Sequence, residues 1–121
     1  MRLIKLDGDF SVSKLPSADN LDLGREFSFL SITDDEISYV CKSEFVPADA
    51  VETEHDWKAL KISGTLDFGM IGVIAKISGL LAEQKISIFV VSTFNTDYIL
   101  VKKSSFEKTL NILSSNGYEI V

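Results

Sequence analysis

The stretch from Gly64 to Val101 restricts the fold more than any other part of the sequence. Its apolar residues recur at three- and four-residue steps up to Leu81, and from Ile86 to Val91 every residue except Ser87 is apolar. This change of period indicates an amphipathic helix followed by a strand. A polar turn at 94–97 then separates two runs of β-forming residues. We therefore expect a βαββ core made of a strand, a helix and an antiparallel hairpin.

The helix of this core is expected to bury one face. Lys76, Glu83 and Gln84 fall on the opposite face. Two glycines, Gly69 and Gly72, stand where the helix begins, so that unpaired backbone N–H groups and the positive end of the helix dipole could hold an anion. The same glycines would also serve a tight turn and close packing of the helix on the sheet. The apolar positions expected on the buried face are Met70, Val73, Ile74, Ile77, Leu80 and Leu81.

The hairpin of the core follows from three consecutive segments. Ile86 to Thr93 has apolar residues on both faces, which is typical of a strand central to a sheet. Phe94 to Asp97 supplies turn residues, and Tyr98 to Lys102 is rich in β-forming residues.

Further elements are predicted on both sides of this core. Trp57 opens the strand that precedes it. Ser104 and Glu107 match a capping box at the start of a second helix, and Asn116–Gly117 offers a left-handed stop for that helix. Tyr118–Val121 then forms a short closing strand. The order is βαββαβ, which favours a four-stranded antiparallel sheet with both helices on one face.

The first half of the chain has a different pattern, which predicts two hairpins and a linker. Residues 2–7 and 9–14 alternate apolar and polar around Asp7–Gly8, and we expect them to form a hairpin. Phe27–Thr33 and Glu36–Lys42 predict a second hairpin, and Phe45–Asp56 an extended linker.

The fold class predicted for the whole chain is α+β. A ferredoxin-like βαββαβ domain at 57–121 is preceded by a mostly β module at 1–56. The second hairpin of this module corresponds in layout to the hairpin of the core, so we interpret the module as a degenerate copy of the same unit.

Charge and hydropathy exclude several classes of function. Residues 1–56 carry 13 acidic against 5 basic side chains, a net charge of −8, whereas 57–121 carry 5 against 7, a net charge of +2. The acidic half would repel a phosphate backbone, so nucleic acid is a poor partner; solubility also explains this charge. No apolar run reaches the roughly 18 residues that would span a bilayer. The first ten residues do not resemble a signal peptide, so we expect no membrane partner and a cytoplasmic protein.

Catalysis is not expected. Cys41 is the only cysteine and His55 the only histidine, and neither sits in a context that would activate a thiolate. Cys41 is predicted to be a small buried strand residue. We expect no metal, no cofactor and no enzyme activity.

At this level of detail the sequence resembles a known family. Gly72–Ile77, followed by a leucine pair and Ile86–Ile88, is similar to the first helix and second strand of ACT domains, the small regulatory modules that bind amino acids. Residues 57–101 look like the tandem ACT proteins that include bacterial stand-alone proteins and the CASTOR-type arginine sensors. One departure concerns the D-x-P-G pattern that commonly starts the helix. Here Ile71 takes the place of the proline and Gly69 that of the acid.

The resemblance implies a ligand site. The amino and carboxylate groups of an amino acid would meet the backbone at Gly72, Val73, Ile74, Thr93 and Phe94. Asp97 would take a cationic group, through a charge-assisted hydrogen bond. The alternative for Asp97 is a solvated residue at the end of its turn.

The resemblance also implies a function. It indicates a non-catalytic, amino-acid-binding regulatory protein that forms a homodimer, because ACT sheets commonly pair at their edges. The alternative is a protein–protein interaction module without a metabolite ligand.

Overall fold

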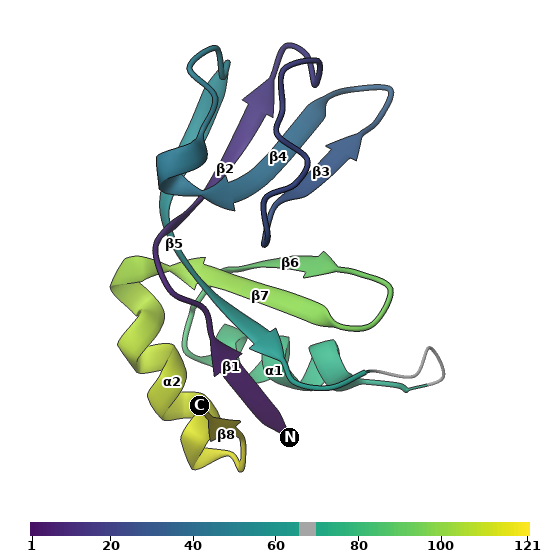
Figure 1. The fold of residues 1–121 in the computed structure, drawn as a ribbon. Coiled ribbons are helices and arrows are strands. Elements are labelled where there is room, and N and C mark those ends of the chain that lie inside the picture. The colour runs from purple at the N-terminus through teal and green to yellow at the C-terminus, as the bar shows by residue number, and fades with distance from the viewer. Residues whose placement is uncertain (66–69) are drawn as a thin grey trace. The chain divides into compact units, whose positions relative to one another are not determined.

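The computed structural model describes residues 1–65 and 70–121 (Figure 1). Gly69, expected at the start of the first helix, lies outside the described residues. The chain divides into an N-terminal unit, Gly8–Trp57, and a C-terminal unit that combines Lys58–Val121 with Met1–Asp7. The second unit therefore includes the first seven residues, which the predicted module at 1–56 had placed in the other half.

The C-terminal unit has the predicted βαββαβ order, so the α+β, ferredoxin-like class is confirmed. Both helices contribute to one hydrophobic core, in which Ile77 and Leu81 of the first helix and Leu113 of the second are fully buried. They therefore pack on the same face of the sheet, as expected. The elements in chain order are β5 (Glu52–Ile62), α1 (Val73–Glu83), β6 (Ile88–Ser92), β7 (Asp97–Lys102), α2 (Phe106–Ser115) and β8 (Glu119–Ile120).

Strand β1 (Arg2–Lys5) adds a fifth strand to this unit. Leu3 pairs antiparallel with Ile62 of β5 and parallel with Ile120 of β8. The strand order is β6-β7-β5-β1-β8, so the expected four-stranded antiparallel sheet is wrong and the sheet is mixed.

The hairpin predicted around Asp7–Gly8 is also wrong. β1 pairs with the end of β5, at Leu60–Ile62, whereas β2 (Phe10–Leu15) pairs with the beginning of β5, from Glu52 to Trp57. The alternating pattern of each segment is satisfied by any partner strand, and the 11-residue β5 is long enough to pair with both.

Two predictions about the core were wrong, one about the burial of Met70 and one about the position of β6 in the sheet. Met70 precedes α1 and is 47% exposed rather than buried. Strand β6 is an edge strand, since β7 is the partner that the structure describes for it, and its residues Ile88–Val91 are half-buried. Apolar residues on both faces show that both faces are covered, but not that both edges are paired.

Helix α2 begins differently from the prediction. A 3-10 turn at Lys103–Ser105 leads into it, Ser105 is at the N-cap, and no side chain among the described residues caps it. The predicted capping box is therefore wrong. Its predicted end is confirmed, because Asn116 is the C-cap and Gly117 has a φ of +91°.

The N-terminal unit is a small β-sheet with strand order β3-β4-β2-β5. β3 (Phe29–Ile32) and β4 (Ile37–Lys42) form the predicted hairpin. The predicted linker at 45–56 is wrong in its second half, because β5 already begins at Glu52.

The hairpins of the two units share their turn. Thr33 donates its backbone N–H and its hydroxyl to the carbonyl of Glu36, at 3.0 and 3.2 Å, and Thr93 does the same to Thr96, at 2.8 and 2.9 Å. β4 and β7 also have the same order of half-buried and buried residues, and a 3-10 turn follows each. These matches support the interpretation of the first half as a degenerate copy.

Neither helix of the described residues is long and apolar enough to cross a membrane.

Candidate functional site

A pocket of about 380 Å³ lies between the start of α1 and the turn that joins β6 to β7. All six residues named from the sequence line it, so the structure brings together two segments about 20 residues apart in the chain. Its volume is within the range of roughly 300–1,000 Å³ that is usual for small-molecule pockets. The six residues are Gly72, Val73, Ile74, Thr93, Phe94 and Asp97.

One wall is the uncapped start of α1. Gly72 is the N-cap, and its carbonyl accepts the first helical hydrogen bond, from Lys76 at 2.9 Å. The N–H groups of Val73, Ile74 and Ala75 therefore have no partner within the helix. No side chain of the described residues caps them. This end of the helix is electropositive and suits a carboxylate.

The other wall is the β6–β7 turn. Both donors of Thr93 are bound to the Thr96 carbonyl, so Thr93 can offer a ligand only acceptor atoms. The buried Thr96 donates its hydroxyl to the carbonyl of Ile62 at 2.7 Å, which ties the turn to β5. Because these hydrogen bonds fix the turn, its acceptor atoms have a defined position, and the turn does not need to rearrange when a ligand binds.

Asp97 supplies the negative charge of the pocket. It is the first residue of β7, it is half-buried, and its carboxylate has no recorded hydrogen bond or ion pair with another described residue. Two apolar residues that line the pocket are also exposed to solvent, Met70 at 47% and Phe94 at 79%. Positive backbone groups on one wall and a carboxylate on the other complement a zwitterion.

Sequence reasoning missed five further lining residues: Met70, Ala75, Ser92, Asn95 and Thr96. Asn95 and Thr96 lie inside the predicted turn, so the turn itself was the signal for them. The role of Thr96 as an anchor could not be foreseen, because its partner Ile62 is 34 residues away.

Cys41 and His55 play no part in this pocket. Cys41 is buried, as predicted, and burial raises the pKa of its thiol to about 11, an effect that the nearby charge of Arg25 only partly offsets. His55 Nδ1 lies 3.0 Å from the hydroxyl of Ser11, to which it is hydrogen-bonded. A protonated, buried thiol is a poor nucleophile.

The φ of +80° at Gly72 gives a first testable prediction. A Cβ there would meet no atom within 4 Å, so Gly72→Ala should be strained through its backbone alone, by about 1–2 kcal/mol of unfolding free energy. The matched control is Gly79→Ala, inside α1 and also without close neighbours, which should stabilise by up to about 1 kcal/mol. Urea unfolding measures both, and equal effects of the two substitutions would contradict the left-handed cap.

Comparison with known proteins places the chain in a family. Residues 52–115 match the family model of the ACT domain. The human "Cytosolic arginine sensor for mTORC1 subunit 1" is 32% identical over 72% of the chain, and its mouse counterpart is 33% identical. The chain spans about 29% of the human relative's length.

Solved structures share the fold. The crystal structure of protein Atu0741 from Agobacterium tumefaciens has a TM-score of 0.87 and 30% identity, and the match covers 99% of this chain and 91% of that one. Aspartate kinase from Clostridium acetobutylicum, an allosteric enzyme, has a TM-score of 0.67 and 16% identity, with 90% of this chain matched to 33% of that one. Together with the family match, they show that the chain belongs to the ACT domain family.

Proposed function

We propose that this chain is a non-catalytic regulatory protein that binds a free amino acid in the pocket between α1 and the β6–β7 turn. The observation that carries the proposal is that one pocket contains two complementary groups. These are the N–H groups of Val73 and Ile74, which no described side chain caps, and the carboxylate of Asp97, which has no partner among the described residues. The helix start would bind the ligand's carboxylate, and Asp97 or the Thr93 carbonyl its ammonium group.

The comparisons support the ligand class. The name of the human relative describes an arginine sensor. A cationic side chain such as that of arginine would find a partner in Asp97. We also propose that the protein acts in the cytoplasm.

A screen of the twenty amino acids by thermal denaturation tests this proposal. A ligand at about 100 times its Kd should stabilise the fold by about 2.7 kcal/mol, which raises the Tm of a chain this long by about 10 °C. The D-enantiomer of each hit is the control, since it reverses the placement of the side chain. No shift with any amino acid up to about 10 mM, a concentration at which even millimolar binding would register, would contradict the proposal.

Regulation requires that ligand binding favour one state of the protein over another. We propose that this state is a homodimer, because the edge of β6 needs cover and Ile71 and Phe94 are exposed apolar side chains. Light scattering on a gel-filtration peak should give twice the mass of the chain. A monomer mass at micromolar concentration, with and without the screened ligand, would contradict the dimer.

A further inference from the structure

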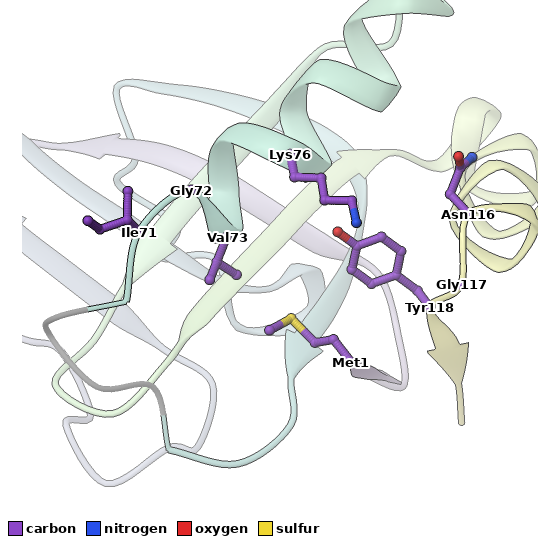
Figure 2. Close-up of a pocket in the computed structure, with 8 residues that line it drawn as sticks. All are labelled: Met1, Ile71, Gly72, Val73, Lys76, Asn116, Gly117 and Tyr118. Atoms are coloured by element: carbon purple, nitrogen blue, oxygen red, sulfur yellow. The ribbon is translucent and has the colours of Figure 1, made fainter.

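A second pocket, of about 260 Å³, opens beside the start of α1 (Figure 2). Gly72 and Val73 line both pockets, but the other residues of the second one differ. Lys76 comes from the second turn of α1, and Tyr118 from the segment between α2 and β8. The residues of this pocket all belong to the C-terminal unit.

Tyr118 is the first indication of a ligand. The residue is only 8% exposed and its ring belongs to the hydrophobic core. Its hydroxyl is accessible at the pocket and has no hydrogen-bond partner within residues 1–65 and 70–121, so it is free to donate to a ligand. Figure 2 shows the side chains of Tyr118 and Lys76 among the residues that line the pocket. Burial raises the pKa of Tyr118, so the hydroxyl stays protonated and can donate at neutral pH.

Lys76 is the second indication. Its ammonium nitrogen lies 5.8 Å from the centroid of the Tyr118 ring, and it forms no recorded ion pair with a described side chain. None of the described residues that line this pocket is acidic. The side-chain amide of Asn116 donates one of its two N–H groups to the Ile112 carbonyl at 2.8 Å. A cation and a hydroxyl donor thus stand beside an electropositive helix start, with no anion of the described chain to match them.

We propose that this pocket binds a small oxyanion, a carboxylate or phosphate group, held by the ammonium of Lys76, the hydroxyl of Tyr118 and the N–H groups at the start of α1. The donor groups come from α1 and from the segment before β8, and together they would share the oxygens of one anion. The volume of about 260 Å³ limits the occupant to a small molecule or a single group. Because both proposals use N–H groups at the start of α1, the anion and the proposed amino acid would weaken each other's binding, by the same factor in each direction.

Titration of the ¹⁵N-labelled chain, followed by amide chemical shifts, tests the pocket. The probes are inorganic phosphate and acetate, each at constant ionic strength with chloride as the balancing salt. We expect saturable shifts at Val73, Lys76 and Tyr118. Saturation by phosphate alone would assign a phosphate group, by acetate alone a carboxylate, and by both a shared oxyanion site.

Substitutions distinguish specific binding in this pocket from non-specific screening of surface charge by the added salt. Lys76→Gln should weaken binding about tenfold or more, and Tyr118→Phe, which keeps the ring in the core, a few-fold. The matched control is Lys61→Gln, because Lys61 also lies over a tyrosine ring, that of Tyr98 at 5.9 Å, but outside this pocket. That variant should bind as the wild type does.

Two outcomes would overturn the proposal. One is a set of shifts that grow linearly with probe up to about 100 mM, as non-specific screening would produce. The other is equal affinity of the wild type and Lys76→Gln. Asp97→Asn should leave anion binding unchanged, because Asp97 does not line this pocket. The effect of Asp97→Asn on amino-acid binding and that of Lys76→Gln on anion binding therefore test the two proposals separately.

Discussion

Leu3→Ala is expected to lower the free energy of unfolding by about 2–5 kcal/mol, although Leu3 is only the third residue of the chain. Its side chain is fully buried among residues of the C-terminal unit, and its backbone lies between β5 and β8. Loss of the side chain would leave a cavity in the core of that unit. Urea unfolding followed by circular dichroism measures the effect.

The control for this prediction is Leu23→Ala. Leu23 is 75% exposed in a loop of the N-terminal unit, so its truncation should change stability by less than about 0.5 kcal/mol. If the two substitutions had the same small effect, β1 would not be part of the core, and the mixed sheet would be contradicted.

Asp97→Asn is expected to weaken binding of the amino acid found in the screen by about 10- to 100-fold, because it removes a charged partner without changing the shape of the side chain. The backbone of Asp97 pairs with Ser92 in the hairpin, and this pairing does not depend on the carboxylate. Stability without ligand should therefore change little. Calorimetric titration measures the affinity.

Asp34→Asn is the matched control for Asp97→Asn. Asp34 lies exposed in the equivalent turn of the N-terminal unit, so the substitution removes the same charge without touching the pocket. Equal weakening by both variants would point to net charge rather than to contact. If Asp97→Asn altered only the assembly of the protein, the interaction module without a metabolite would be favoured.

The sequence predicted those parts of the fold that depend on local pattern. The helical spacing of Ile77 and Leu81, the turn between β6 and β7 and the stop at Gly117 are all properties of short segments. The errors concern which strand pairs with which. β1 and β6 were both identified as strands, but their neighbours depend on residues far along the chain, such as Ile120 for β1.

The two pockets differ in how far their lining residues could be predicted from the sequence. The six residues of the first were found because a helix start and a hairpin turn each leave a local signal, and because the resemblance to ACT domains joins them. The second pocket depends on Lys76 and Tyr118, which lie on separate elements. From the sequence pattern alone, Lys76 is expected to be an ordinary residue on the solvated face of the helix. Nothing in the sequence indicates that a tyrosine 42 positions later lies beneath it.

The pairing of β1 with β8 has a consequence for the order of folding. Arg2 and Glu119 are 117 residues apart, yet their strands are neighbours and their side chains form an ion pair at 3.3 Å. During synthesis β1 is made before β8, so β1 cannot complete its pairing until β8 has been made. The long loop closure makes this contact slow to form. The N-terminal unit, whose strands lie between residues 10 and 57, can fold while the rest of the chain is still being synthesised.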